Sequence, residues 1–402
     1  MRILVLDGNE NQAVAAVRSL SRAGHRVLVG APTSLSKAGC SRYRGGTFVY
    51  PPPQQDAEAF AQRIAAKAAE EPGTFVLPMT ERTTLPVSGR RELVLGKGGV
   101  LVLPPHEVVL RAFDKAETTA LARRLDILVP ETCVVSRLEE LEPLTGSLKF
   151  PLVLKAQRSE DVTPTGAVRA GGRPHYARTP NELRDAFLDI RRRSAGVLVQ
   201  EFVKGTGEGY FALMRHGQPI AEFAHRRIRD VRPSGSGSAL RVSAEPSPAL
   251  RSAGRAVLGA LEWHGVAMVE FRVGPNGELY FLEVNGRFWN SLALAIHAGV
   301  DFPALLAEMA QGRTASAAGT YREGVRCRWL LGDVRHLIEV WRGAPPSYPC
   351  PYPSRWRTLV EFLTPRRGTY HDNFEWSDPL PELVDWLDFA FRVLPRGRNA
   401  NG

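Results

Sequence analysis

The sequence has few cysteines and no long apolar run. Its four cysteines show no CxxC or zinc-like spacing, so we expect free thiols in a reducing compartment; they are Cys40, Cys133, Cys327 and Cys350. No apolar run approaches the roughly 18 residues of a membrane span. A strand-like segment starts at Arg2, and no signal peptide is apparent before it. We therefore expect a cytoplasmic protein with no membrane partner.

Lysine is scarce as well, although the formal net charge is +10. Seven lysines leave 45 of the 52 basic residues as arginine. The arginines are spread over the whole chain, with short clusters at 191–193 and 226–232, and do not form one stripe interleaved with aromatic residues. This distribution argues against a nucleic-acid partner. Arginine forks suit the carboxylates and phosphates of anionic small molecules.

Two common catalytic signatures are also absent. Residues 7–11 follow a strand but contain one glycine, so they are not the GxGxxG dinucleotide fingerprint. Neither a GxSxG motif nor a Cys/His arrangement is present to supply a protein nucleophile.

At 402 residues the chain is too long for one ordinary core, which predicts several domains in series. Strand-like runs at 2–6, 26–29, 47–50, 74–77 and 100–103 alternate with helical segments. This alternation predicts a parallel, doubly wound α/β sheet. Glu81 and Arg82 follow the end of one such strand, where α/β sheets place ligands, so both are candidate substrate residues.

Residues 266–285 predict a β-hairpin closed by a two-residue turn at Asn276-Gly277. With that turn Glu270 lies opposite Glu283, at roughly 5 Å between Cβ atoms, and Asn285 shares their face. The opposite face carries an apolar set, namely Ala267, Val269, Phe271, Tyr280, Leu282 and Val284. Two carboxylates and an amide oxygen suit a hard cation such as Mg²⁺. The alternative is a solvated face that tolerates a weak repulsion.

Other residues fit a nucleotide site around this hairpin. Lys155 ends an apolar strand and Lys115 lies in the first turn of a helix, so both ammonium groups can reach phosphates beneath the segment 159–172. The strand at 197–203 can read a purine edge through its backbone. Glu208 can accept hydrogen bonds from ribose hydroxyls.

In this order the features resemble the ATP-grasp superfamily. More narrowly they are similar to its carboxylate–amine ligase branch, with an ATP site like that of carbamoyl phosphate synthase and biotin carboxylase. The resemblance covers most of residues 1 to about 312. It rests on Phe113-Asp114-Lys115, Val153-Leu154-Lys155 and the segments 200–205, 225–227, 263–271 and 282–289.

The resemblance implies an α/β and α+β fold in four parts. Residues 1–104 would form a Rossmann-like pre-ATP-grasp domain, and 105–195 an ATP-grasp small lobe with a phosphate-covering loop. Residues 196–312 would form the metal-binding lobe, followed by a C-terminal extension at 313–402. Within the extension, residues 376–387 can pack on the core, close the substrate pocket or mediate dimerisation, so a homodimer is a further expectation.

The resemblance also implies a role for individual residues. Lys115 and Lys155 would hold the phosphates of ATP, Gln200, Glu201 and Val203 would surround adenine, and Glu208 would bind ribose. Glu270, Glu283 and Asn285 would carry one or two Mg²⁺ ions, with Mn²⁺ as a substitute. Arg287 and Arg241 would stabilise charge on the transferring phosphoryl group. The substrate candidates are Glu81, Arg82, His225, Arg226 and Arg227.

Three departures from the family pattern are visible. Gly286 replaces the proline of the usual Asn-Pro-Arg, and the segment after Lys155 has fewer glycines than phosphate-binding loops usually have. Residues 234–238 form a looser version of the glycine-rich stretch that precedes Arg241.

The implied reaction is an ADP-forming ligation of small molecules. A carboxylate accepts the γ-phosphoryl group of ATP, and an amine then displaces phosphate from the acylphosphate to form an amide or peptide bond. Amino acids of specialised metabolism are the expected substrates, and the loop at 159–172 would exclude water. The alternatives are a different acceptor (bicarbonate, or a kinase-like phosphorylation) and a non-catalytic nucleotide-binding or scaffold protein.

Overall fold

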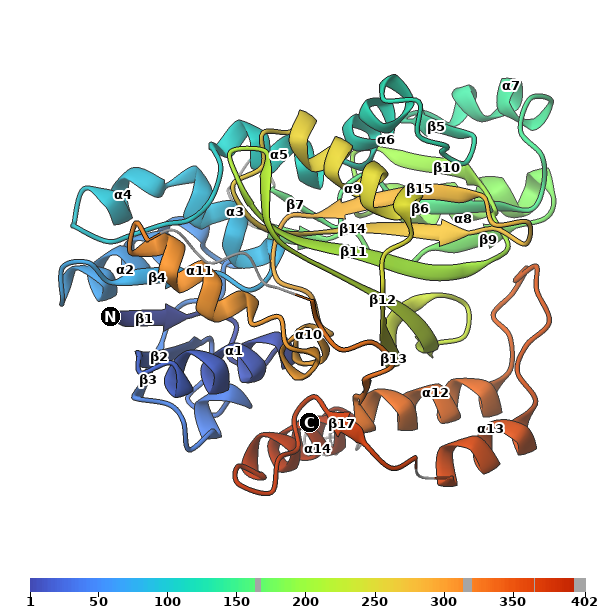
Figure 1. Ribbon diagram of the computed structural model, residues 1–402. Helices are drawn as coiled ribbons and strands as arrows, with labels where there is room; N and C mark the ends of the chain where they lie inside the picture. The colour runs from blue at the N-terminus through green and yellow to red at the C-terminus, as the bar shows by residue number, and fades with distance from the viewer. Residues whose placement is uncertain (163–167, 314–319, 365, 394–402) are drawn as a thin grey trace, which may run out of the picture.

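The structure is a computed structural model that describes residues 1–162, 168–313, 320–364 and 366–393. Figure 1 shows an N-terminal α/β unit, a larger β-rich unit beside it, and a group of C-terminal helices packed below. Residues 163–167, in the middle of the predicted phosphate-covering loop, lie outside the described residues.

The N-terminal unit is built on a parallel sheet. Its strands, in spatial order, are β3 (Gly46–Val49), β2 (Arg26–Ala31), β1 (Arg2–Val5) and β4 (Phe75–Leu77). Consecutive parallel strands need crossover connections. Helix α1 (Asn11–Arg22) connects β1 to β2, and α2 (Ala57–Ala69) connects β3 to β4. The predicted parallel α/β sheet is therefore confirmed. The strand expected at 100–103 contributes a single bridge, between Val100 and Phe75.

Two short helices complete this unit at the carboxyl end of β4. They are α3 (Glu81–Gly89) and α4 (Arg91–Leu95). The Rossmann-like assignment of the unit and the four domain boundaries stay predictions.

The small lobe is an antiparallel sheet with one covered face. Its strands, in spatial order, are β5 (Thr132–Val135), β10 (Val197–Glu201), β6 (Leu152–Ala156) and β9 (His175–Ala177). Leu152, Leu154 and Val199 enter a core with α7 (Leu141–Thr145) and α8 (Pro180–Arg191). Because side chains alternate along a strand, the intervening residues of β6 and β10 face the other way, toward the large sheet. A short hairpin, β7 (Glu160–Val162) and β8 (Val168–Ala170), follows β6.

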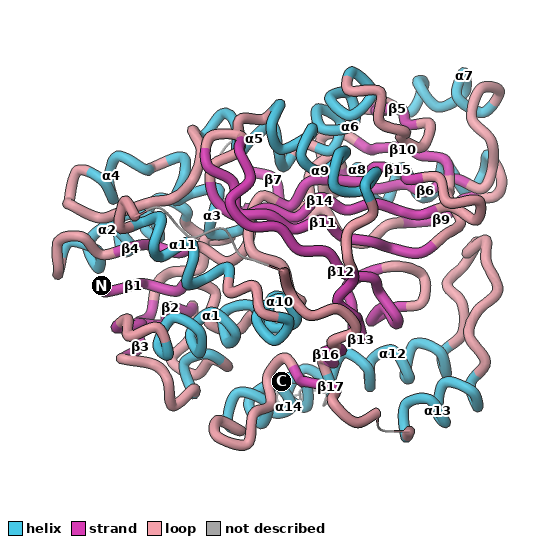
Figure 2. The backbone as a smooth tube through the Cα atoms, in the orientation of Figure 1, coloured by secondary structure: helices cyan, strands magenta, loops and turns pink. Residues whose placement is uncertain are grey.

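The large lobe is a seven-stranded sheet. In spatial order its strands are β15 (Leu279–Asn285), β14 (Gly265–Val273), β11 (Thr206–Arg215), β12 (Gln218–Arg232), β13 (Ser236–Ala244), β16 (Arg326–Arg328) and β17 (Thr369–His371). Neighbouring strands are antiparallel except β16 and β17. Figure 2 shows β14, β11 and β12 as the long strands in the middle of the molecule.

Both faces of the large sheet are covered by helices. One face packs on α5 (His106–Phe113), α6 (Lys115–Arg124) and α9 (Pro248–Ala260). The other shares a core with α10 (Leu292–Ala298), α11 (Phe302–Ala310) and α1 of the N-terminal unit. Helices α5 and α6, which the prediction groups with the small lobe, thus contribute to a core of the large sheet.

The β14–β15 hairpin has the predicted carboxylate pair but a different turn. Glu270 lies opposite Glu283, as expected. The turn is one residue longer, because Gly274 N donates to Glu278 O at 2.8 Å and Gly277 takes a left-handed φ of 89°. A bulge at Leu282 restores the register, since Phe271 pairs with Phe281. The predictions of a two-residue turn and of Tyr280 and Leu282 on the apolar face are therefore wrong, since Tyr280 pairs with Arg272 and Leu282 lines the cavity described below.

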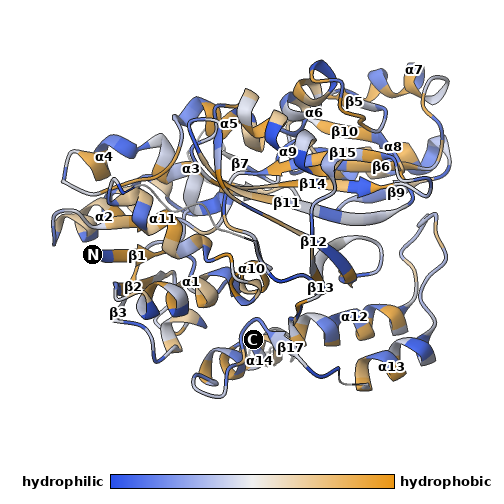
Figure 3. Cartoon of the chain, viewed as in Figure 1, coloured by the Kyte–Doolittle hydropathy of each residue, from blue (hydrophilic) through white to orange (hydrophobic). Residues whose placement is uncertain are grey.

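The C-terminal part contributes α12 (Leu330–Arg342), α13 (Arg355–Leu363) and α14 (Leu380–Val393). In Figure 3 the first two helices carry both hydrophobic and hydrophilic residues. Residues 372–385 dock on the N-terminal unit, where Arg18 pairs with Asp378 and Lys37 with Asp385. Of the three roles predicted for 376–387, the structure shows packing on the core.

No single helix in the described part of the chain is long and apolar enough to span a bilayer. Helices α10 and α11 reach that length and composition only together, and they are bent by 93° relative to each other. Residues of both lie in the core shared with the N-terminal unit.

Candidate active site

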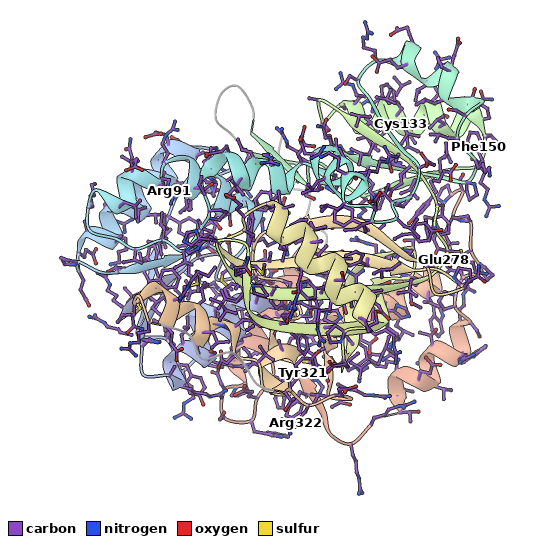
Figure 4. The ribbon with its side chains drawn as sticks, turned by 45° about the horizontal axis from the view of Figure 1, so that its top comes forward. Arg91, Cys133, Phe150, Glu278, Tyr321 and Arg322 are labelled. Carbon is purple, nitrogen blue, oxygen red and sulfur yellow. The ribbon has the colours of Figure 1, made fainter. Side chains whose placement is uncertain are left out.

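A cavity of about 390 Å³ lies between the small lobe and the large sheet. Its wall comes from β6, β9 and β10 on one side and from β12, β14 and β15 on the other. Eight of the predicted site residues line it: Lys115, Lys155, Gln200, Glu201, Val203, Arg227, Glu270 and Glu283. Figure 4 gives the setting, with Cys133 and Phe150 labelled in the small lobe and Glu278 at the tip of the hairpin.

Two lysines bring positive charge to the cavity. Asp114 caps α6 by accepting from Ala116 N at 2.9 Å, which fixes Lys115 in the first turn of that helix. Lys115 Nζ donates to Ser159 Oγ at 2.7 Å, and Lys155 Nζ donates to Gln200 Oε1 at 3.1 Å. Burial lowers the pKa of Lys155, and Glu283 partly opposes that effect. Both ammonium groups are thus directed toward the space between the lobes.

The two carboxylates of the hairpin each face a cation. Arg227 Nη2 lies 2.8 Å from Glu270 Oε2, and Lys115 Nζ lies 3.8 Å from Glu283 Oε2. Burial raises the pKa of Glu283, but Lys115 and Lys155 outweigh it and bring that pKa below its ordinary value. Glu283 is therefore an anion at neutral pH, beside a second carboxylate on the neighbouring strand.

The donor set of the hairpin fits a hard divalent cation. Glu270 and Glu283 supply carboxylate oxygens, and Asn285 adds an amide next to them, with Nδ2 donating to Glu283 Oε1 at 3.3 Å. Such oxygen ligands suit Mg²⁺ or Mn²⁺. The described residues hold no cluster of three or more His, Cys, Asp or Glu side chains that is arranged for a metal. The set therefore fits a cation that takes its remaining ligands from water or from a bound phosphate.

Arg287 connects the hairpin to the N-terminal unit. Its Nη2 donates to Asn285 Oδ1 at 2.7 Å and lies 3.9 Å from Glu81 Oε1. Burial raises the pKa of Glu81, and its Oε2 has no hydrogen-bond partner. The structure thus brings Glu81 and Arg287 together, next to the carboxylate pair rather than in the wall of the cavity.

Arg82 lies in a group of acidic side chains next to this point. It contacts Glu10 at 2.7 Å and Glu160 at 3.7 Å. Burial raises the pKa of Glu160 to about 7, although Arg82 acts in the opposite direction. Arg82 therefore neutralises carboxylates of the chain itself.

Only one of the three residues 225–227 faces the cavity. Arg227 lines it, whereas His225, on the same face of the sheet, is buried under the core next to α10 with its Nε2 2.8 Å from Ser291 Oγ. Arg226 lies opposite Glu208 on the other face of the sheet and is exposed.

Two predicted positions need correction. Glu208 pairs with Phe271, which belongs to the core on the face opposite Glu270, so the structure does not place it at the ribose of a nucleotide in the cavity. Arg241 is fully buried and forms an ion pair with Asp372, while its Nη1 donates to Ser238 O at 3.0 Å. Arg241 thus joins the large sheet to the C-terminal segment and does not reach the cavity.

Several lining residues were not found from the sequence. They are Tyr176, Asp230, Arg272, Leu282 and Tyr348. Leu282 enters the wall through the bulge. Tyr348 reaches it from a segment far along the chain, so no local pattern marks it.

Comparison with known proteins agrees with this geometry. A family model described as ATP-grasp in the biosynthetic pathway with Ter operon matches residues 194–332. The chain is 26% identical over 253 residues to the carbamoyl phosphate synthase large chain of Pyrococcus furiosus, which covers 59% of this chain and 22% of that protein. Residues 194–332 are therefore an ATP-grasp region.

Solved structures show the same ATP-grasp fold. The biotin carboxylase of Campylobacter jejuni, in a βγ-ATP complex, superposes with a TM-score of 0.63 at 14% identity, covering 81% of this chain and 74% of that one. The L-amino acid ligase of Bacillus licheniformis gives 0.59 at 17% identity, covering 77% and 74%. This chain spans about a fifth of the length of the curated relatives that it matches.

The glycine at position 286 has a physical explanation in the structure. A Cβ atom at Gly286 would lie 2.3 Å from Cη2 of Trp263, a fully buried ring. The departure from the usual proline is therefore matched by a large neighbour that occupies the space.

Proposed function

We propose that this protein is an ADP-forming ligase that activates a carboxylate with Mg²⁺ and ATP and joins it to an amine. The observation that carries the proposal is the meeting of Glu270, Glu283, Lys115 and Lys155 around one cavity between two lobes. The match of residues 194–332 to an ATP-grasp family model supports it. The similarity to a carbamoyl phosphate synthase and to an L-amino acid ligase fits the same class of reaction.

The nucleotide would lie along the cavity with its phosphates toward the hairpin. Lys115 and Lys155 would neutralise phosphate oxygens, and their ammonium groups already lie within 4 Å of acceptors on the cavity wall. The base would lie next to residues 200–203, where β10 ends. Leu282 lines the cavity from the opposite lobe and would add an apolar surface against a purine face.

Mg²⁺ held by Glu270 and Glu283, with Asn285 beside them, would reduce the negative charge of the phosphates. The rest of the catalysis would come from position and charge. An amine cannot displace oxide from a carboxylate, because oxide is too poor a leaving group. Transfer of the γ-phosphoryl group to a carboxylate oxygen gives an acylphosphate, from which phosphate can leave. The attacking amine then forms the C–N bond, the C–O bond to phosphate breaks, and the amine loses a proton.

The acceptor carboxylate would bind near Arg287. Its guanidinium touches Asn285 of the hairpin and lies 3.9 Å from Glu81 of the N-terminal unit, so it stands where the two parts meet. A planar fork at this point suits both the substrate carboxylate and the transferring phosphoryl group. The N-terminal unit would then supply the rest of the substrate contacts.

ADP release tests this proposal. The full chain is incubated with Mg²⁺ and ATP across a matrix of amino acids, other carboxylates, amines and bicarbonate. We expect release that needs a carboxylate and an amine together, with a product mass equal to their sum minus water. Glu283→Gln should lose the activity, and Glu278→Gln, at a half-buried carboxylate of the same hairpin that does not line the cavity, should keep it.

Other outcomes of the matrix would contradict the ligase. Release with bicarbonate alone, or a phosphorylated product without an amide, would assign a different acceptor to the same site. Nucleotide binding with no release for any pair would favour a protein that binds nucleotide without turning it over.

A further inference from the structure

The connection between α12 and α13 leaves the C-terminal layer and reaches the cavity. Figure 1 shows it rising beside the ends of β9 and β14. We call residues 343–354 the strap. Tyr348, at its middle, lines the cavity together with residues of both lobes.

The strap is attached to the small lobe. Arg178, which follows β9, donates through Nε to Ser347 O at 3.3 Å and through Nη2 to Tyr348 O. The Tyr348 ring packs edge-on against Tyr176 of β9, with centroids 5.1 Å apart, and lies 6.2 Å from the ring of Phe202. Three aromatic side chains thus gather next to residues 200–203.

The same tyrosine is attached to the large lobe. Tyr348 Oη donates to Pro233 O at 3.1 Å, in the connection between β12 and β13. Tyr176 Oη donates to Ser234 O, the next carbonyl along the chain. Pro233 and Ser234 also line the cavity, so both lobes and the strap meet at one point of its wall.

The strap has the composition of a stiff segment. Five of its twelve residues are proline, at positions 345, 346, 349, 351 and 353. Proline fixes φ and favours extended, semi-rigid chain. A preorganised segment loses little conformational entropy when it holds a side chain against a ligand.

We propose that the strap completes the nucleotide-binding cavity, with the Tyr348 ring contacting the base end of a purine nucleotide and its hydroxyl holding the two lobes around it. The inference rests on the proposed function and assigns a role to a C-terminal segment that the sequence left without one. Arg272, two residues beyond Glu270 on the same face of β14, lines the cavity and donates to Gly205 O at 3.3 Å. A Cβ atom at Gly235 would lie 3.9 Å from Arg272 Nη2 and 4.0 Å from Tyr176 Oη, so the aromatic group lies near Arg272, on the turn side of Glu270. A purine base would bind there when its phosphates bind at the lysines.

Binding of MgADP, measured by calorimetry on the full chain, tests the role of Tyr348. We expect Tyr348→Ala to weaken binding about tenfold, in line with the loss of one aromatic contact to a base. Tyr348→Phe keeps the ring and should weaken binding only about two- to threefold. Tyr370→Ala is the matched control and should bind MgADP like the wild type, because this tyrosine lies in β17, is 37% exposed and is not among the lining residues.

Hydrogen exchange on the unmodified chain tests the strap without a substitution. MgADP should slow amide exchange in residues 343–354 and in 200–205 together. Protection of 200–205 alone would overturn the inference, as would a Tyr348→Ala variant that folds and binds like the wild type. A wild-type chain that does not bind MgADP at millimolar concentration would overturn the ligase proposal and the inference with it.

Discussion

The nucleotide-binding cavity and the C-terminal junction both gather charged residues, but the charges have different partners. At the junction Arg18, Lys37 and Arg241 pair with Asp378, Asp385 and Asp372, and all six side chains are buried. In the cavity, Arg227 lies 2.8 Å from Glu270, but Lys115 is 3.8 Å from Glu283, and Lys155 Nζ donates to the neutral amide of Gln200 at 3.1 Å.

This comparison shows that residue type alone does not identify a catalytic cation. From the sequence we expected the same role, stabilising the transferring phosphoryl group, for Arg241 and Arg287. Arg241 is enclosed with Asp372, while Arg287 lies beside Asn285 and Glu81 at the edge of the carboxylate pair. A buried pair of this kind contributes to structure, because each charge is neutralised within the chain.

The largest expected effect concerns Arg241. Arg241→Met leaves Asp372 as an unpaired buried charge and should lower the free energy of unfolding by about 3–5 kcal/mol. Denaturant unfolding measures this change. The double variant Arg241→Met/Asp372→Leu should recover most of it. Arg251→Met, which removes an exposed pair with Glu245, should cost less than about 1 kcal/mol.

The second effect concerns Arg287. Arg287→Lys keeps the charge but loses the planar fork, so kcat for ADP release should fall by about 10²–10³-fold, while the unfolding midpoint changes little. Arg255→Lys, at an exposed arginine that pairs with Glu222, is the control and should leave kcat unchanged. If Arg287→Lys loses stability but keeps kcat, Arg287 has a structural role like that of Arg241, and the proposed difference between the two arginines is wrong.

The smallest effect is a pH dependence of folding stability that comes from Glu382 at the C-terminal junction. Burial raises the pKa of Glu382 from 4.5 to about 7, and its Oε2 has no hydrogen-bond partner. Between these values the unfolded chain releases the proton that the folded chain keeps, so stability falls as pH rises from about 4.5 to 7 and stays level above.

The variant Glu382→Gln should remove this loss of folding stability at higher pH. Thermal or denaturant unfolding should show the variant more stable than the wild type by on the order of 1–2 kcal/mol at pH 8, with the difference disappearing near pH 4. Glu323→Gln, at an exposed position, serves as control. An equal difference at both pH values would mean that the effect is not the ionisation of Glu382.

Local patterns predicted most of the elements and part of the site. The strands expected at 2–6, 26–29, 47–50 and 74–77 agree with β1, β2, β3 and β4 to within two residues, because short apolar runs bounded by turns are local signals. The Glu270–Glu283 pair was predicted correctly although the turn was wrong. The longer turn and the bulge at Leu282 shift the register by one residue in opposite directions and cancel at the carboxylates.

The rest depends on contacts between distant segments. Nothing near Arg241 in the sequence indicates Asp372, more than 100 residues away, and nothing near Tyr348 indicates Tyr176. Glu208 was expected at the ribose from the resemblance, but the alternation of β11 places it on the opposite face of the sheet. Such positions are determined by strand register and by the docking of the C-terminal segment.

The central claim is that the cavity binds a nucleotide through a metal held by the hairpin. The direct measurement is calorimetric titration of ADP into the wild type, Glu283→Gln and Glu278→Gln, each with Mg²⁺ and with EDTA. We predict that Mg²⁺ tightens binding by at least tenfold in the wild type and in Glu278→Gln, and by less than about twofold in Glu283→Gln. Equal Mg²⁺ dependence in all three proteins, or no binding of ADP to the wild type, would contradict the account.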